Sequence, residues 1–436
     1  MSVTFERATE EDFSEIVDLG NYVFSHSHSS TDFPSLLPKL YKKEHKTAPF
    51  HFIAREDGKI KAQVGSFPMK LTILQEDLLV YGIGTVSVHP YARSSGYMKK
   101  LMEMAQEDMQ NAGADAAFLG GQRQRYQYFG YDQCGQIIRF TIDTANVKHC
   151  YGKDFQPGLH FVEMKASSPY LEQCSRWFHS QPIHVLRESN RFYDILKNWK
   201  ADAWAILNKD ELIGYLCASS DGKFIHEIII GKDELVISGD MSGCNADETL
   251  QDLTAADAEH TTCELPVFIK NPDLLPYIFA SWLATRKINE VKHKAAIYDI
   301  KAVSGLMNIC EEYSIEPVDN IAVYHFDHVV QAYLKLKMKY QPLPDGILII
   351  KIEDRHTIKI TATNKNVSVV KCNENPHLSL TYMNALAFFF GPIGSNGFPI
   401  FVNEKSIGSL GWAAEQTNLA MQWFPLSLHF DKQDGV

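Results

Sequence analysis

The sequence lacks several features that would assign it directly to a class of protein. Its eight cysteines are scattered and form no C-x-x-C pair, so we interpret them as reduced thiols rather than as a disulfide or zinc framework. No apolar run approaches transmembrane length, and the polar, acidic start MSVTFERATEEDF is unlike a signal peptide. We therefore expect a cytoplasmic protein that does not enter a membrane.

Positive charge is also in short supply. The 436 residues carry 42 Lys and Arg against 53 Asp and Glu, a net charge of −11. This balance argues against nucleic acid and anionic membranes as partners, and it is compatible with a cationic substrate. The length predicts two or three domains, and 45% hydrophobic residues are typical of a globular protein.

The most informative stretch is Tyr81–Met102, YGIGTVSVHPYARSSGYMKKLM. Val86 and Val88 alternate with polar residues, which predicts a strand that ends at His89-Pro90. A tight turn of small residues follows, and an amphipathic helix is expected to open at about Tyr97. A strand, a Gly-containing turn and a helix start together form an anion site, because the first helical N–H groups point at the ligand. On the motif R-x-x-G alone, an ordinary strand–helix connection would be the better interpretation.

The whole block is more specific, and it resembles the acetyl-CoA signature of the GNAT acetyltransferase superfamily. Arg93, Gly96 and the strand Val86-Ser87-Val88 match that signature, whereas Met98 stands where many members have Gly or Ala. The resemblance implies that acetyl-CoA is the co-substrate and that no metal takes part. It also implies that the backbone of Val86 and Val88 binds pantetheine. The full set of expected co-substrate contacts is Val86, Ser87, Val88, Arg93, Ser94, Ser95, Gly96, Tyr97 and Gly121.

A second resemblance lies in Gly120–Tyr131, which ends in Y-x-x-F-G-Y. This ending is similar to that of the enhanced intracellular survival (Eis) family of GNAT enzymes, in which the first tyrosine is the general acid. That position is Tyr126 here, and a phenol near the departing sulfur can protonate the CoA thiolate. For Tyr128 and Tyr131 we expect packing over the sheet instead.

A carboxylate to act as general base is missing where many GNAT enzymes have one. Leu78–Thr85 contains no acidic residue, and Gly82 and Gly84 occupy its middle. In the Eis family the C-terminal carboxylate reaches into this site, which here would be that of Val436. The chain, however, continues past Phe430, where Eis-type chains typically stop at an aromatic residue. Three possibilities stay open: the Val436 carboxylate, the Asp431 side chain, or no strong base.

The remainder resembles the layout of Eis-family proteins. This resemblance implies an α/β (α+β) protein with tandem GNAT-like domains, the second degenerate, followed by a sterol-carrier-protein-like domain. Helix–hairpin order recurs after residue 146, but no second CoA signature follows, and Gly239–Gly243 is the nearest candidate. The third domain resembles the Eis C-terminal domain only diffusely. The predicted ranges are 1–145 for the acetyltransferase domain, 146–297 for the degenerate domain and 298–436 for the third.

The expected function is transfer of an acetyl group from acetyl-CoA to a primary amine by direct attack. A CoA-binding regulatory protein of the same fold without efficient turnover is the alternative. The acceptor stays open among polyamines, lysine-like side chains, aminoglycoside-like amines and peptides. The family resemblance also implies a homo-oligomer, a hexamer.

Overall fold

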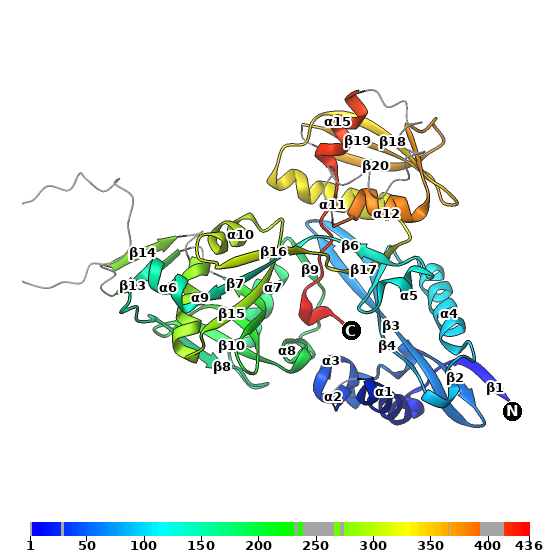
Figure 1. The fold of residues 1–436 in the computed structure, drawn as a ribbon, viewed down its shortest axis with the longest axis horizontal. Helices are drawn as coiled ribbons and strands as arrows, with labels where there is room; N and C mark the ends of the chain where they lie inside the picture. The colour runs from blue at the N-terminus through cyan, green and yellow to red at the C-terminus, as the bar shows by residue number, and fades with distance from the viewer. Residues whose placement is uncertain are drawn as a thin grey trace, which may run out of the picture.

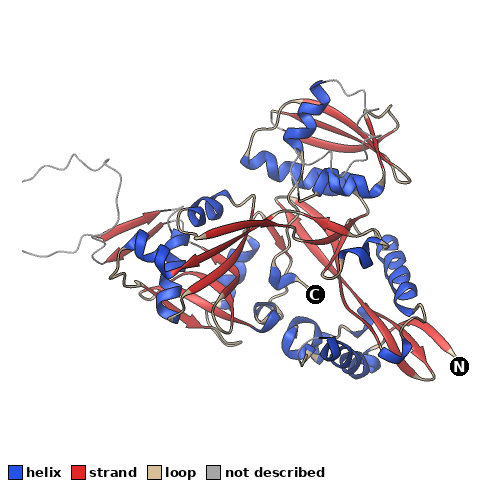
Figure 2. Ribbon diagram, viewed as in Figure 1, coloured by secondary structure: helices blue, strands red, loops and turns tan. Residues whose placement is uncertain are grey.

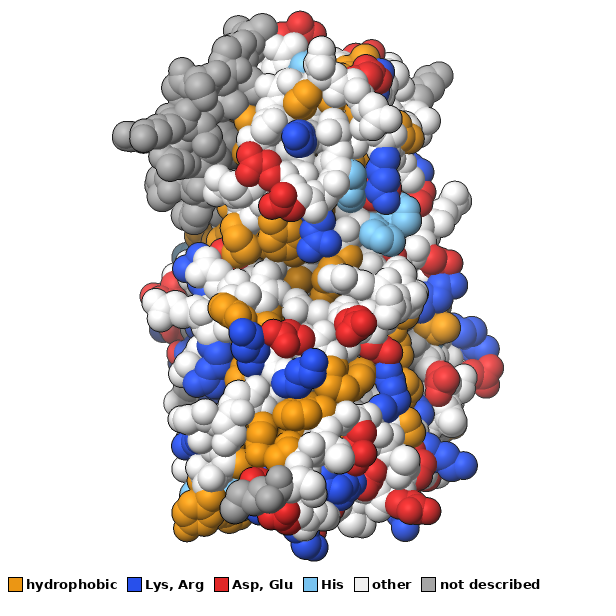
Figure 3. All heavy atoms as spheres, turned by 90° about the vertical axis from the view of Figure 1, so that its right-hand side faces the viewer, with side chains coloured by type: hydrophobic (Ala, Val, Ile, Leu, Met, Phe, Trp, Pro, Cys, Tyr) orange, Lys and Arg blue, Asp and Glu red, His pale blue; other side chains and the backbone are white. Residues whose placement is uncertain are grey.

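The computed structural model describes residues 2–27, 30–231, 234–238, 266–270, 274–364, 366–392 and 414–436. The chain forms a mixed α/β structure around three main sheets, and helices cover the faces of each (Figures 1 and 2). The face shown in Figure 3 mixes acidic, basic and hydrophobic side chains. Among the residues described, no helix combines the length and the apolar character needed to cross a bilayer.

The first sheet has the strand order β1-β2-β3-β4-β5-β17-β6, with β9 added on β3. Helix α1 (Phe13–Ser27) packs with the short helices α2 (Phe33–Leu36) and α3 (Pro38–Tyr41) in one hydrophobic cluster, and α4 (Tyr97–Asn111) packs in another. The strands are β1 (Val3–Arg7), β2 (His51–Glu56), β3 (Lys59–Ile73), β4 (Glu76–Val88), β5 (Ala116–Leu119), β6 (Asp132–Cys134), β9 (Ile183–Val185) and β17 (Asp319–Val323).

The middle sheet, in the order β16-β7-β15-β12-β11-β10-β8, has the same plan. In both sheets one central pair is parallel, β4 with β5 and β12 with β15, among antiparallel neighbours. Its strands are β7 (Ile137–Asp143), β8 (Leu159–Glu163), β10 (Ala201–Asn208), β11 (Glu211–Ser219), β12 (Phe224–Ile230), β15 (Glu290–Ala296) and β16 (Glu312–Glu316). The helices of this part are α6 (Thr144–Tyr151), α7 (Leu171–His179), α8 (Phe192–Leu196), α9 (Leu274–Arg286) and α10 (Ile300–Met307), and β13 (Glu234–Ser238) pairs with β14 (Pro266–Lys270).

The third sheet, β20-β19-β18-β21, packs against α11 (Phe326–Tyr340) and α12 (Tyr382–Phe390). Its core is continuous with one end of the first sheet, because Leu71, Val80 and Phe118 belong to the same cluster as Phe326 and Phe389. The strands are β18 (Gly346–Ile352), β19 (Thr357–Thr363), β20 (Asn366–Cys372) and β21 (Leu378–Leu380), and α15 (Ala414–Trp423) precedes the C-terminal tail.

Strands cross the predicted domain boundaries. β7, inside the predicted range 1–145, pairs in the middle sheet, whereas β17, inside 298–436, inserts between β5 and β6 of the first sheet. The sequence predicts a helix over 187–199 and another over 378–390. In the structure only Phe192–Leu196 is α-helical in the first, and Leu378–Leu380 is a parallel strand before α12 in the second. Gly239–Gly243 lies outside the described residues.

The C-terminal tail returns from the third sheet to the first (Figure 1). Phe430 stacks on Phe118 with ring centroids 4.3 Å apart, and the tail then forms a single turn, η7 (Lys432–Asp434). The Arg187 guanidinium binds the Asp434 carboxylate (Nε–Oδ1 2.9 Å) and the Glu227 carboxylate (Nη2–Oε2 2.6 Å). All three side chains are at most 3% exposed. Burial alone would lower the pKa of Arg187, but the two carboxylates outweigh it and raise that pKa well above its usual value.

Removing Arg187 should therefore destabilise the protein strongly. Arg187→Ala leaves two buried carboxylates unpaired and should lower the free energy of unfolding by about 3–5 kcal/mol. Arg176→Ala is the matched control, because Arg176 pairs with Glu172 on an exposed helix face; it should cost less than about 0.5 kcal/mol. Urea unfolding followed by tryptophan fluorescence measures both, and equal stability of the two variants would contradict the proposed weight of the buried cluster.

Candidate active site

The candidate site lies where β4 and β5 separate. The two strands pair only through Val80–Gly82 and Ala116–Phe118. Beyond this point β4 stays paired with β3 up to Val88, whereas Leu119 pairs with β17. The register of β3 with β4 shifts at Thr85, which has φ 47°, so a bulge bends β4 away from β5. The edge of β4 that carries Val86 and Val88 is therefore available to a ligand in an extended conformation.

The turn after β4 has the predicted form. Gly96 is the N-cap of α4 with φ 77°, and α4 begins at Tyr97 as expected. A Cβ placed at Gly96 would meet no heavy atom within 4 Å, so this glycine is required by its backbone conformation and not by crowding. Arg93, Ser94 and Ser95 are exposed, whereas Tyr97 is buried against Phe5. The turn thus presents main-chain donors and one guanidinium to solvent, the composition of an anion site.

Tyr126 lies in the short helix α5 (Arg123–Gln127), which follows β5. The residue is 7% exposed, and burial raises its pKa, so the phenol stays protonated at neutral pH. Gly121 lies directly against it: an added Cβ would come 2.8 Å from Cε2 of the Tyr126 ring. The expected packing of Tyr131 is confirmed, since it is fully buried. For Tyr128 the expectation is wrong, because this residue is 67% exposed.

The C-terminus reaches β4. A Cβ on Gly82 would lie 2.6 Å from Cγ2 of Val436, and one on Gly84 would lie 3.0 Å from the Val436 carboxyl carbon. The two glycines that replace the expected carboxylate therefore make room for the terminal residue. Asp431 lies five residues earlier and its carboxylate accepts a hydrogen bond from His429 (Oδ1–Nε2 3.2 Å). Of the three possibilities for a base, the structure places the Val436 carboxyl group at the strand.

Several residues that fix this terminus were not singled out from the sequence. Lys39 donates to the carbonyl oxygens of Gln433 (3.2 Å) and Asp434 (2.6 Å), and burial lowers its pKa to about 7. Asn198 donates to the Gln433 carbonyl at 2.7 Å. These partners lie more than 200 positions from the tail in sequence, so no local pattern marks them.

A second unforeseen group supports the bulge of β4. The Tyr41 hydroxyl bonds both Thr85 Oγ1 (2.7 Å) and His51 Nε2 (3.2 Å). Burial lowers the pKa of His51 to about 4, so its ring is neutral near pH 7. His51 Nδ1 lies 3.2 Å from the carbonyl oxygens of Thr47 and Ala48, which indicates that Nδ1 carries the proton and that Tyr41 donates to Nε2. The positive-φ residue of the bulge is thus fixed by a buried hydrogen-bond chain.

A cavity of about 250 Å³ opens beside the C-terminus. Val436 and Asp434 line it, together with apolar side chains from the first sheet, Phe67 and Met69. The segment that follows β9 supplies Arg187, Glu188 and Arg191. The aromatic residue Phe67 lines the cavity, whereas Phe24 and Phe33 of the same domain pack edge to face against each other.

Comparisons with known proteins agree with this geometry. Residues 4–134 match the family model described as an acetyltransferase (GNAT) domain. No curated protein matches the chain. Solved structures share the fold over almost the full length, among them a probable N-acyltransferase of unknown function from Enterococcus faecalis (TM-score 0.61, 12% identity, 98% of both chains covered). A GCN5-related N-acetyltransferase from Anabaena variabilis matches with a TM-score of 0.59 and 14% identity, covering 99% of this chain and 98% of that one.

Eis1 from Mycobacterium abscessus is similar as well, with a TM-score of 0.60 and 10% identity over 100% of both chains. At these identities the likeness concerns the fold. The domain that carries the diverging strands, the Gly96 turn and Tyr126 is the one that the family model matches. Residues 4–134 therefore form a GNAT acetyltransferase domain, in a chain that shares its whole fold with Eis1 from Mycobacterium abscessus and with other GNAT proteins.

Proposed function

We propose that this protein is an N-acetyltransferase that moves an acetyl group from acetyl-CoA to a primary amine. The observation that carries the proposal is the approach of the Val436 carboxyl group to Gly84, at the point where β4 and β5 diverge. Two further features support the proposal: the turn after β4 has Gly96 at the N-cap of α4, and the segment after β5 carries the protonated phenol of Tyr126. Direct acetyl transfer requires that the thioester be positioned and that two protons be transferred.

In the proposed reaction the amine enters from the cavity and attacks the thioester carbon as a neutral nitrogen. The Val436 carboxylate accepts the proton that the nitrogen loses. Tyr126 donates its proton to the sulfur as the C–S bond breaks, and products are an amide and free CoA. The raised pKa of Tyr126 supports the acid role, because the group enters the reaction protonated.

A CoA-binding protein without turnover is the alternative, and the lack of a carboxylate within Leu78–Thr85 favours it. The approach of the Val436 carboxyl group to Gly84 supports the enzyme instead. The acceptor could be a polyamine, a lysine-like side chain, an aminoglycoside-like amine or a peptide. A screen of such amines with acetyl-CoA, read by release of free thiol, tests turnover and identifies the class.

Further parts of the proposal concern the rest of the chain. We infer that the middle domain is a degenerate GNAT-like domain, supported by the shared strand plan, and that the third domain is sterol-carrier-protein-like. The predicted ranges 1–145, 146–297 and 298–436, the cytoplasmic location and the homo-oligomer, a hexamer, belong to this proposal. Analytical ultracentrifugation and CoA titration, with one CoA expected per chain, test the assembly and the degenerate domain.

The Gly96 turn should accept a neutral side chain better than an anionic one. Gly96→Asp should abolish CoA binding, because its carboxylate would face the CoA phosphates. Gly96→Asn is the matched control: it has the same shape, tolerates positive φ about as well, and carries no charge. Isothermal titration calorimetry with CoA should show a large loss for Asp and a smaller one for Asn. Unchanged affinity in Gly96→Asp would remove the phosphate assignment.

Tyr126→Phe should lower kcat about a hundredfold or more while changing CoA affinity little, since only the proton-donating hydroxyl is lost. The kcat/KM ratio should fall by a similar factor. Tyr128→Phe, at an exposed tyrosine two residues away, should leave both parameters unchanged. Steady-state kinetics with the amine from the screen provide the measurement, and full activity of Tyr126→Phe would return this residue to a packing role.

The charge of the terminal carboxylate should matter more than the length of the tail. Semisynthesis can place an amide at Val436 and leave every tail contact of Lys39 and Arg187 intact. We expect turnover to fall about a hundredfold or more, and the pH dependence on the base side to disappear. The same ligation with a free acid is the control. Equal rates for acid and amide would show that the amine enters without help from this base.

A further inference from the structure

A group of metal-ligating side chains lies away from the proposed active site, at the start of β5. Asp115 precedes β5, His325 is the N-cap of α11, and His328 lies in its first turn. One oxygen of Asp115 and one ring nitrogen of each histidine all lie within 4.8 Å of one another. His328 Nδ1 is 2.7 Å and His325 Nδ1 is 3.3 Å from Asp115 Oδ1. His325 Nδ1 is buried, and no hydrogen-bond partner for it occurs among the described residues.

The three side chains are oriented by neighbours. Asp115 is 5% exposed, and its second oxygen accepts the Leu79 N–H at 2.8 Å, which leaves Oδ1 for the histidines. The other nitrogen of His328, Nε2, lies 3.7 Å from Asp327 Oδ2. A histidine that binds a metal through one nitrogen commonly directs the other toward a carboxylate, which fixes the ring and raises its basicity. Asp327 therefore stands where such a supporting carboxylate is expected.

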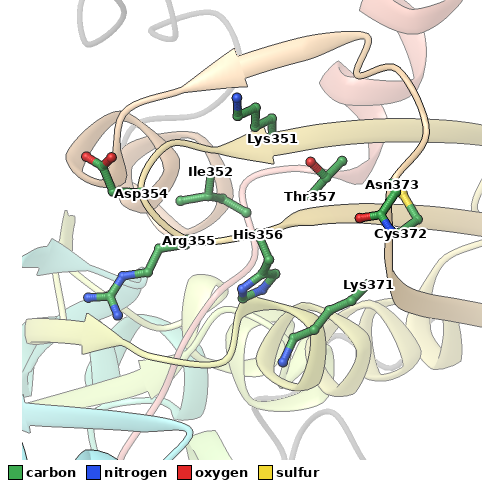
Figure 4. A pocket seen from close by; sticks show the side chains of 9 residues that line it. All are labelled: Lys351, Ile352, Asp354, Arg355, His356, Thr357, Lys371, Cys372 and Asn373. Carbon is green, nitrogen blue, oxygen red and sulfur yellow. The ribbon is translucent and has the colours of Figure 1, made fainter.

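Asp327 is in turn contacted by two residues that line a pocket of the third sheet (Figure 4). His356 Nε2 and Lys371 Nζ each lie 3.5 Å from its carboxylate, and Figure 4 shows both side chains directed toward the same helix. Asp327 is 7% exposed. Lys371 neutralises part of its charge, so Asp327 suits a supporting role better than that of a direct ligand.

We propose that Asp115, His325 and His328 bind a divalent transition-metal ion of the zinc type. Two imidazoles and one carboxylate are ligands that Zn²⁺ accepts, with a fourth position left for water. The exposure of the His328 ring (55%) and the His325 ring (34%) keeps that position open to solvent. The site is separate from the Gly96 turn and Tyr126 and takes no part in the proposed acetyl transfer.

Two of the three ligand separations are close to those around a bound ion. Tetrahedral ligands about 2.1 Å from zinc stand about 3.4 Å from one another. Asp115 Oδ1 lies 2.7 Å from His328 Nδ1 and 3.3 Å from His325 Nδ1. The ion would replace the proton that His328 shares with Asp115, so that binding widens the shorter contact and releases a proton. The positive end of the α11 dipole opposes a cation, and the two carboxylates, Asp115 and Asp327, offset it.

Such an ion would join two parts of the chain. Asp115 is tied to β4 through Leu79, immediately before the strands pair and then diverge. His325 and His328 lie at the start of α11, the helix that packs against the third sheet. The metal would therefore clamp α11 against the root of the diverging strand pair.

The test uses the full chain without an affinity tag, freed of metal by a chelator and titrated with ZnCl₂ alone. Calorimetry should show one Zn²⁺ per chain, and His328→Ala should weaken this binding more than about tenfold. Asp115→Asn should weaken it as well. His160→Ala, which removes an exposed histidine of β8, is the matched control and should bind as the native chain does. Zn²⁺ should also raise the Tm of the native chain and of His160→Ala but not of His328→Ala.

Co²⁺ absorption supplies a readout of ligand type. A spectrum without a thiolate charge-transfer band is expected, because the site contains no cysteine. Circular dichroism of metal-free His328→Ala shows whether it folds, and Asp115→Asn provides a second variant if it does not. Equal Zn²⁺ affinity in the native chain and both variants, absence of binding, or a thiolate band would each overturn the proposal.

Discussion

The buried contact of Arg187 with Glu227 and Asp434 is the interaction on which the candidate site depends. Glu227 belongs to the middle sheet and Asp434 to the tail, and Arg187 follows the strand β9 that pairs with β3 of the first sheet. A buried ion cluster is weak evidence for net stability, because desolvation offsets much of its attraction. It does fix geometry, since any other placement would leave a charge unpaired. Val436, two residues after Asp434, is positioned accordingly.

The second constraint is the space in front of β4. A main chain can approach a strand closely only where side chains are absent, and Gly82 and Gly84 provide that absence. The lack of a glutamate on β4 and the presence of the Val436 carboxyl group there are therefore linked, because a glutamate at Gly82 or Gly84 would occupy the place that Val436 fills. The bulge at Thr85, fixed by Tyr41, then bends β4 away from β5, and the co-substrate is proposed to extend into the gap between the two strands.

Local patterns predicted the local elements well. The alternation before Pro90 and the helix start at Tyr97 follow from short-range sterics and hydrogen bonding, and the structure confirms both. The exchange of β7 and β17 between sheets could not be predicted, because the pairing of Ile321 with Phe118 joins positions about 200 residues apart and leaves no local signal. The contact of Lys39 with the tail could not be predicted for the same reason, because its partners Gln433 and Asp434 lie far away in sequence. The positive φ of Thr85 could not be predicted either, since β-branched residues rarely adopt such a conformation.

The two halves of the candidate site therefore differ in what they require. The Gly96 turn and Tyr126 belong to segments contiguous with β4 and β5, so the first domain can form them largely from its own residues. The Val436 carboxyl group depends on the whole chain: the third part anchors the tail through the Leu426 N–H and the Phe389 carbonyl, and the middle part holds it through Asn198 and Trp199. A first domain cut from the rest would also lose β17 and expose the edge of β5. The proposed co-substrate recognition is accordingly local, whereas the proposed proton acceptor exists only in the assembled protein.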